Sequence, residues 1–291
     1  MELQWPLILF TTFISWCAGT FASQAYLALK GKGEKIQMTS WIVSAILLVV
    51  GGVAVFMHLE HWERIFNGFG HLSSGITQEL IAIVVLAIVA IVYLAMIRRN
   101  EGKVPAWLAV VAILVCLALV FVMGHSYVME ARPAWDSFLW ILTLIGAAFI
   151  LGPATVAFLA DLKGDKEAAE ALGLPTIIGA IINGAAALAA GFSISAASKA
   201  LTDVGWYYDL THPTHKLITP SLNAFSGDSA LPMILGVIAI GVVVPIVAAI
   251  MGKKTGNWKV WGCVAVLAAL VGAICLRVVF YQAGVSMFMF Y

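Results

Sequence analysis

Charged residues are scarce in this sequence. Asp, Glu, Lys and Arg together account for 11% of its 291 residues, whereas soluble domains contain roughly 25%. Hydrophobic residues account for 62%, and the mean hydropathy is +1.01. These values exclude an ordinary soluble domain and predict a protein that crosses a membrane several times. The net charge of +1 and the lack of a long basic run give no reason to expect nucleic acid as a partner.

Residues that bind metals are also few and poorly placed for a metal site. All four cysteines lie inside apolar runs without C-x-x-C spacing: Cys17, Cys116, Cys263 and Cys275. Such thiols are typical of a buried core rather than of a zinc site or a disulfide framework. The six histidines lie at the ends of apolar stretches or between them, whereas a membrane haem needs axial ligands that face each other inside the bundle. We therefore expect neither haem nor a metal ion in this chain.

Long apolar stretches make up most of the sequence. A helix that spans a membrane needs about 20 mostly apolar residues, and eight stretches meet this length: 6–29, 40–58, 80–97, 104–124, 138–160, 174–198, 231–251 and 260–283. The start, MELQWPLILF, lacks the positive segment of a signal peptide, so we expect the first stretch to be a retained helix. The sequence predicts an all-α integral membrane protein, with residues 1–291 forming a single bundle of eight transmembrane helices.

The distribution of Lys and Arg predicts the orientation of this bundle. Eleven of the sixteen basic residues fall in the connections after the first, third, fifth and seventh stretches. Short loops rich in Lys and Arg stay on the cytoplasmic side of a membrane. We therefore expect both termini outside, together with the connection between the second and third stretches.

Ionisable residues gather in that outer connection. Residues 56–80, FMHLEHWERIFNGFGHLSSGITQEL, contain three histidines, three glutamates and an arginine. We expect His58 to end the second helix and Glu79 to begin the third at the same membrane boundary. Arg277 lies seventeen residues into the eighth stretch, which a helical rise of about 1.5 Å per residue places roughly 26 Å along that helix. The sequence thus predicts that polar groups from several helices meet near the outer boundary.

The membrane midplane, by contrast, lacks charged residues. Ion-coupled transporters usually place carboxylates or broken helices near the midplane, and the middles of these stretches contain almost no Asp, Glu, Lys or Arg. An outer polar pocket in an apolar bundle suits a quinol instead, because its head group needs hydrogen-bond partners and proton acceptors while its tail needs only apolar helices. A His and a Glu at the interface can fill both needs.

Four short motifs in register resemble one family. They are Trp5-Pro6-Leu7 with Cys17-Ala18-Gly19, then His58-Leu59 with Arg64, Phe66-Asn67 and Gln78-Glu79, then Gly152-Pro153, and finally Arg277 with Phe280-Tyr281. Together they make the chain resemble the membrane-anchor subunit of the DMSO reductase family of molybdopterin oxidoreductases, over its whole length. The sequence departs from the family pattern at Glu60 and Leu276, where the family has glycine.

The resemblance implies a function and a set of partners. A molybdopterin catalytic subunit and an iron–sulfur subunit would dock on the outer face of the anchor. The anchor would bind menaquinol as a substrate and pass its electrons to the nearest iron–sulfur cluster, with no metal of its own. The family's quinol site falls on His58, Arg64, Phe66 and Glu79. The terminal reaction would belong to another chain, so this chain would take part in the oxidoreductase only through quinol oxidation.

Each of these residues also has a structural interpretation. Glu79 is either the proton acceptor or a carboxylate stabilised by the N-terminus of its helix. His58 either binds a quinol oxygen or caps the last carbonyls of its helix. Arg64 binds either the site or instead a lipid phosphate or a partner carboxylate. Arg277 and Tyr281 either bind the quinol or hold the last helix in place.

Two other functions remain open at the level of sequence. The first is the anchor of another molybdenum enzyme, such as a polysulfide reductase. The second is a protein without a redox role, either a small-solute permease or an assembly scaffold. A permease needs a continuous polar path through the midplane, which these stretches do not offer.

Overall fold

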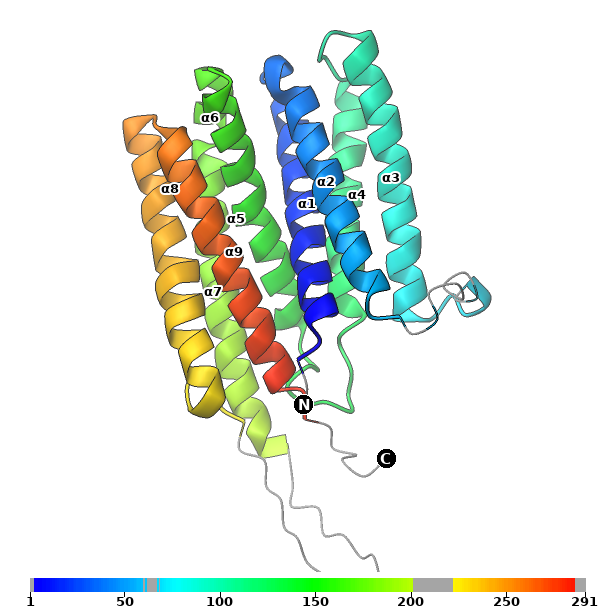
Figure 1. The fold of residues 1–291 in the computed structure, drawn as a ribbon, viewed down its shortest axis with the longest axis vertical. Coiled ribbons are helices and arrows are strands. Elements are labelled where there is room, and N and C mark those ends of the chain that lie inside the picture. Colours follow the sequence, from blue (N-terminus) through cyan, green and yellow to red (C-terminus); the bar gives the residue numbers. More distant parts are fainter. Residues whose placement is uncertain (1–2, 60, 62–66, 68, 201–221, 286–291) are drawn as a thin grey trace, which may run out of the picture.

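The computed structural model describes residues 3–59, 61, 67, 69–200 and 222–285. Within these residues, eight helical segments are long and apolar enough to cross a membrane, which confirms the predicted number of spans (Figure 1). The helices are α1 (Trp5–Leu29), α2 (Gln37–Phe56), α3 (Gly75–Arg99), α4 (Ala106–His125), α5 (Phe138–Leu162), the short α6 (Lys166–Ala171), α7 (Gly173–Ala197), the π-helical segment η5 (Pro232–Val243) that continues as α8 (Val244–Thr255), and α9 (Trp258–Gln282). The described residues contain no strand.

Helical structure follows from the apolar sequence itself. In lipid, backbone N–H and C=O groups find no water, so each spanning segment must satisfy its own hydrogen bonds. Side chains complete several helix starts. Ser137 accepts the Leu139 N–H at the start of α5 (3.2 Å), and Asp165 accepts the Ala168 N–H at the start of α6 (3.1 Å). Gly256, whose φ of 68° suits glycine, ends α8.

Two helix ends near the predicted site differ from the sequence-based prediction. The sequence places the start of the third helix at Glu79, but α3 begins at Gly75, so Glu79 is the fifth residue of the helix. The sequence also places His58 at the end of the second helix, but α2 ends at Phe56. Apolarity alone underestimates α3 because its first turn contains glycine and polar residues that still form backbone hydrogen bonds, as the Gln78 N–H does with the Ser74 carbonyl (3.0 Å).

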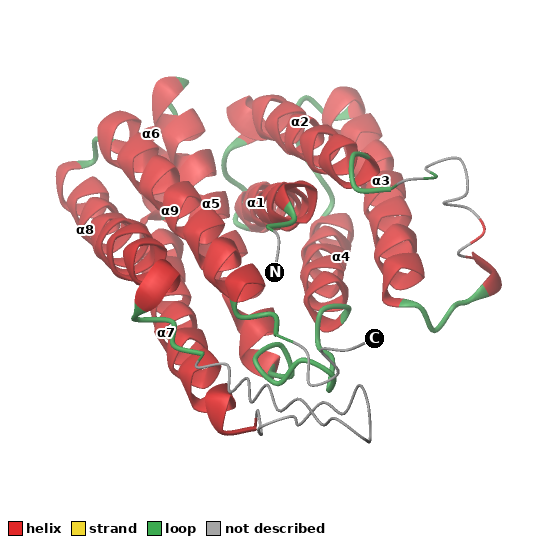
Figure 2. Cartoon of the chain, turned by 60° about the horizontal axis from the view of Figure 1, so that its bottom comes forward, coloured by secondary structure: helices red, strands yellow, loops and turns green. Residues whose placement is uncertain are grey.

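The spanning helices form two groups that meet at α1 and α5. Helix α1 packs against α2, α4 and α5, while α3 packs mainly on α4. Helix α5 packs against α7 and α9, and α9 packs against η5 and α8. Figures 1 and 2 show α1 near the centre of this arrangement. Helices α2 and α3 are the least buried spans, so much of their apolar surface faces the lipid.

Glycines bring α1 and α5 into backbone contact. A Cβ atom added to Gly19 would lie 2.1 Å from the carbonyl oxygen of Ala148, and one added to Gly152 would lie 2.2 Å from the Gly19 carbonyl. Small residues at helix interfaces allow such an approach in membranes, where van der Waals packing drives helix association. Helix α5 continues through Pro153, the residue after this contact.

The two ends of the bundle differ in chemistry. Helices α1, α3 and α5 begin, and α2, α4 and α9 end, at one end, which we call the Glu79 end (Figure 1). The connections that hold most Lys residues lie at the other, the Asp161 end. The helix ends nearest to the two termini, Trp5 and Gln282, therefore lie on the same side of the bundle. That this is the outer side of the membrane stays a prediction.

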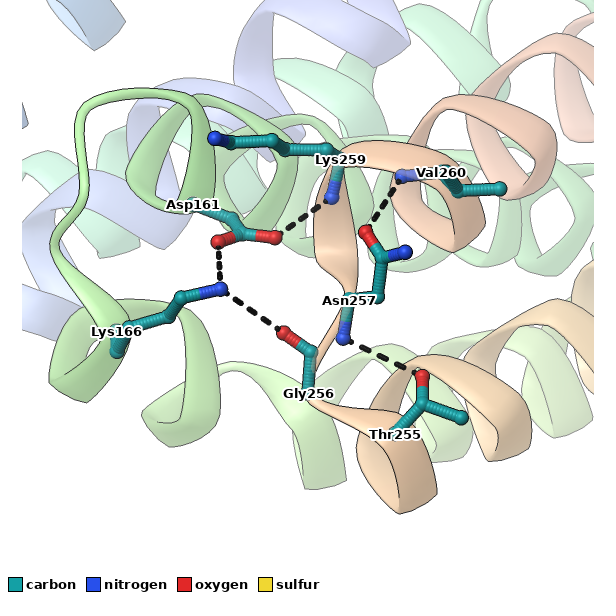
Figure 3. A network of polar contacts seen from close by, with 7 residues as sticks. All are labelled: Asp161, Lys166, Thr255, Gly256, Asn257, Lys259 and Val260. Atoms are coloured by element: carbon teal, nitrogen blue, oxygen red, sulfur yellow. Dashed lines mark hydrogen bonds and ion pairs between the residues drawn. The ribbon is translucent and has the colours of Figure 1, made fainter.

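A buried carboxylate ties the connections together at the Asp161 end (Figure 3). The Asp161 side chain is inaccessible to solvent and forms an ion pair with Lys166. It also accepts the backbone N–H of Lys259 at 2.8 Å. Lys166 in turn donates to the carbonyl of Gly256 at 3.4 Å. These contacts fasten α6 and the α8–α9 turn to the end of α5.

Asp161→Asn should therefore destabilise the bundle. The amide keeps an acceptor for the Lys259 N–H but loses the charge that faces Lys166, and we expect a loss of about 1–3 kcal/mol in unfolding free energy. Thermal unfolding in detergent would measure this as a lower melting temperature. The matched control is Asp136→Asn, at an exposed position at the Glu79 end. Equal melting temperatures for the two variants would contradict a stabilising role for Asp161.

Candidate functional site

Glu79 is a buried carboxylate at the Glu79 end of the bundle. Its side chain points from α3 toward α4 and is only 8% exposed. One carboxylate oxygen, Oε1, forms a hydrogen bond with the hydroxyl of Ser126, the residue after α4. The same hydroxyl lies 2.9 Å from the Met123 carbonyl. Because a serine hydroxyl has one proton, it can donate to only one of these oxygens, and both contacts are satisfied when Glu79 is itself protonated and donates to Ser126.

This pairing gives Glu79 two usable states. As a carboxylate it accepts the Ser126 proton, and as a carboxylic acid it donates to the Ser126 oxygen. Ser126 adapts to either state because its hydroxyl can rotate toward the Met123 carbonyl. A buried group with a partner for both states can take up a proton and release it without leaving a polar atom unpaired.

Arg277 is a buried cation close to the same end. Its guanidinium is 1% exposed and links α9 to α1: Nε donates to Thr11 Oγ1 at 2.9 Å, and Nη2 donates to the Thr11 carbonyl at 3.2 Å. Nη1 donates to the Ala273 carbonyl at 2.9 Å. The described residues place no carboxylate within ion-pair distance of it. Arg277 therefore supplies fixed positive charge that no neighbouring anion in the described part of the chain neutralises.

Two tyrosines interact with both the carboxylate and the cation. Tyr127 follows α4, Tyr281 lies in α9, and both are buried. Burial, reinforced by the neighbouring Tyr281 and Glu79, raises the pKa of the Tyr127 hydroxyl well above its ordinary value, and Arg277 opposes that shift only in part. The Tyr127 hydroxyl therefore stays protonated. The Tyr281 hydroxyl lies near the Tyr127 hydroxyl and makes no well-aligned hydrogen bond among the described residues, so its proton is available to a ligand.

Aromatic rings hold the tyrosines in place. Phe280 stacks on Trp140 with ring centroids 3.6 Å apart and on Trp135 at 4.5 Å. Tyr127 meets the Phe280 ring edge-on at 6.3 Å, and the Trp135 indole donates to the Phe280 carbonyl at 2.7 Å. Arg132 lies over the Trp135 ring at 4.4 Å. These contacts fix the α4–α5 connection against the end of α9. We call the group Glu79, Ser126, Tyr127, Arg277 and Tyr281 the Glu79 cluster.

Comparison with known protein families identifies the chain. The model of the family described as DMSO reductase anchor subunit (DmsC) matches residues 1–283. The chain belongs to the DMSO reductase anchor subunit (DmsC) family. The match includes all eight spans and every residue of the Glu79 cluster. A search of curated proteins found no match.

Membership of the DmsC family sets the general role of the chain. It is a multi-pass membrane protein and the anchor of a reductase complex of the DMSO reductase type. The suspected resemblance to this family is thereby confirmed, and association with a catalytic reductase follows from it.

The structure of this DmsC-family anchor brings together three of the predicted site residues. Glu79, Arg277 and Tyr281 all lie at the Glu79 end, where Glu79 and Arg277 each act on Tyr281 electrostatically. His58 is exposed, two residues beyond α2, and no contact joins it to Glu79 among the described residues. Arg64 and Phe66 lie outside the described residues, so their assignment to a quinol site stays a prediction.

Several residues that belong to the cluster or contact it escaped the sequence-based prediction. Ser126 lies in the polar run His125-Ser126-Tyr127 at the end of the fourth span, and this run is the signal that points to it. Thr11 and Ser15 gave no comparable signal, because hydroxyls in membrane helices usually bond to their own backbone. Both do so here, with Thr11 Oγ1 2.9 Å from the Leu7 carbonyl and Ser15 Oγ 2.7 Å from the Thr11 carbonyl.

The cluster contains oxygen and nitrogen groups suited to an organic ligand. Within the described residues, no group of three or more His, Cys, Asp or Glu side chains is arranged to hold a metal ion. A neutral tyrosine donor, a titratable carboxylate and a fixed guanidinium can instead contact a small ring that carries two oxygens and loses protons.

Proposed function

We propose that this anchor oxidises a quinol, menaquinol by resemblance to its family, at the Glu79 cluster and passes the electrons to an iron–sulfur subunit docked on the same end. The observation that carries the proposal is Glu79: a buried carboxylate, hydrogen-bonded to Ser126, at one end of an apolar bundle. Such a group is costly to bury, so it is expected where it performs a function.

The chemistry assigns a role to four members of the cluster. Oxidation of one quinol to quinone releases two protons and two electrons. Glu79 accepts a proton from one quinol hydroxyl and releases it on its own side of the membrane, and the proton of the second hydroxyl leaves to water on the same side. Tyr127 and Tyr281 donate hydrogen bonds to the other quinol oxygen, and Arg277 stabilises negative charge that develops there. The electrons would leave one at a time to an iron–sulfur cluster of the partner, which would in turn supply the molybdopterin subunit.

The remaining predicted residues complete this proposal. His58 would hydrogen-bond a quinol oxygen, Arg64 would stabilise the negative charge of the site, and Phe66 would pack on the ring. All three precede α3 in the chain, and Glu79 lies within the second turn of that helix.

The basic connections support the proposed orientation. Lys residues flank the turns at the Asp161 end, between α1 and α2, after α5 and after α8. The positive-inside rule puts that end in the cytoplasm and therefore puts the Glu79 end outside. We propose that the partner subunits dock there, on the outer face of the bacterial cytoplasmic membrane.

Purification of the whole complex in mild detergent tests this function. We expect the chain to co-purify with an iron–sulfur protein and a molybdenum protein, and the preparation to oxidise added menaquinol when a terminal acceptor of the reductase is present. Reduction of the complex by a soluble dye, which bypasses the anchor, is the control. A complex that is active with the dye but does not oxidise any quinol would contradict the proposal.

A further inference from the structure

An apolar groove opens on the lipid-facing side of the bundle. It has a volume of about 360 Å³, and α1, α4, α5 and the start of α7 line it almost entirely with apolar atoms. This volume falls in the range of roughly 300–1,000 Å³ typical of small-molecule sites. On its rim, Leu117, Phe149 and Ile178 are 45%, 45% and 44% exposed. The groove can therefore admit a chain sideways from the membrane.

Small residues explain why the groove exists. Ala18 and Ala22 of α1 and Ala148 of α5 form part of its lining, next to the point where Gly19 and Gly152 bring the two helices into backbone contact. With little side-chain volume above this contact, the larger residues of α4 and α7 form walls without filling the space between them. A groove built by close packing of two helices is a stable part of the fold.

The groove points toward the Glu79 cluster along two helices. On α1, the lining residues Ala18 and Ala22 continue the helix face that carries Thr11 and Ser15, the residues that hold Arg277. Ser15 is three residues from Ala18, roughly 4.5 Å along the axis. On α4, the lining residue Val120 lies six residues before Ser126, or roughly 9 Å.

The direction of the groove suits the tail of a bound quinol. From Ala18 it continues along α1 to Tyr26, roughly 12 Å further toward the Asp161 end. A quinol whose ring lies in the cluster must direct its hydrocarbon tail into the membrane.

We propose that this groove binds the polyisoprenoid tail of the quinol whose ring is oxidised at the Glu79 cluster. The inference rests on the proposed function and adds to it a determinant of substrate preference: the anchor distinguishes long-tailed quinols from short ones by contacts made far from the reacting oxygens. Loss of the tail contacts should raise KM, because these contacts are equally strong in the ground state and the transition state.

Filling the groove tests the proposal. Ala22→Phe introduces a ring into the groove, and we expect the KM of the complex for menaquinol to rise about tenfold, with Ala22→Leu giving a smaller increase. The KM for menadiol, which has the ring but no tail, should change by less than about twofold. The matched control is Ala118→Phe, which adds the same ring at an exposed position of α4 outside the groove. Phe149→Ala removes a rim side chain without overpacking and should raise the menaquinol KM as well.

Each outcome supports the proposal or overturns it. A rise confined to menaquinol, absent in Ala118→Phe, supports a tail groove. An unchanged menaquinol KM in both Ala22→Phe and Phe149→Ala overturns it, and so does an equal rise for menaquinol and menadiol. Native mass spectrometry that shows a phospholipid lost from Ala22→Phe with an unchanged KM would assign the groove to lipid. If the wild-type complex oxidises neither quinol, the proposed function itself fails.

Discussion

Glu79→Gln is expected to reduce quinol-dependent turnover of the complex by about 100-fold or more, the usual contribution of a positioned acid–base group. Glutamine has nearly the same shape and can still accept the hydrogen bond from Ser126, so the fold should be preserved. It cannot accept a proton from the quinol. The measurement is steady-state menaquinol oxidation by the purified complex, with the dye-dependent activity of the catalytic subunit expected to stay unchanged.

A second carboxylate at the same end provides the control. Glu130 lies in the connection between α4 and α5 and is exposed, so Glu130→Gln changes the charge near the site without touching the Glu79 cluster. We expect turnover within about twofold of the wild type for this variant, as for surface substitutions generally. Wild-type quinol turnover in Glu79→Gln, or equal losses in both variants, would remove Glu79 from the mechanism.

Gly19→Val is expected to destabilise the bundle strongly. A Cβ at this position would lie 2.1 Å from the Ala148 carbonyl oxygen and 2.8 Å from its carbonyl carbon. Backbone atoms cannot rotate away, so α1 and α5 would have to separate, at a cost of about 3 kcal/mol or more. Thermal unfolding in detergent and the yield of folded protein from membranes would both measure this loss.

The matched control is a glycine inside a neighbouring span. A Cβ added to Gly52 of α2 would meet no atom within 4 Å. Gly52→Val makes the same chemical change and carries the same helix-propensity effects, but without the backbone collision. We therefore expect its melting temperature to stay within a few degrees of the wild type. Similar melting temperatures for the two valine variants would show that the α1–α5 contact does not limit stability.

The number of helices could be predicted from the sequence because the membrane imposes a single rule. Every spanning segment must bond its own backbone and bury apolar side chains in lipid, so length and hydropathy suffice. Helix ends follow no such rule. The first turn of α3, from Gly75 to Gln78, is not apolar enough to be counted, and the short α6 lies in a stretch with three charged residues. For this reason the sequence-based prediction placed the start of α3 too late, and the position of Glu79 within the helix was wrong.

The depth of the site in the membrane could be predicted from the sequence, but the contacts between its side chains could not. Helical rise places Glu79, Arg277 and Tyr281 near one membrane boundary, and this needs only residue counting. Which side chains then meet depends on the rotation of each helix about its axis, and that rotation is set by close contacts such as Gly19 with Ala148. The partnership of Glu79 with Ser126 and of Arg277 with Thr11 therefore emerged only from the packed structure.

Reduction of the partner's iron–sulfur clusters by added menaquinol tests the central claim most directly. In a rapid-mixing experiment on the purified complex without a terminal acceptor, electron paramagnetic resonance would follow the clusters as quinol is added. We predict that the wild-type complex reduces its clusters at least as fast as it turns over, and that Glu79→Gln does so about 100-fold more slowly. Cluster reduction at equal rates in the two complexes would contradict oxidation of quinol at the Glu79 cluster.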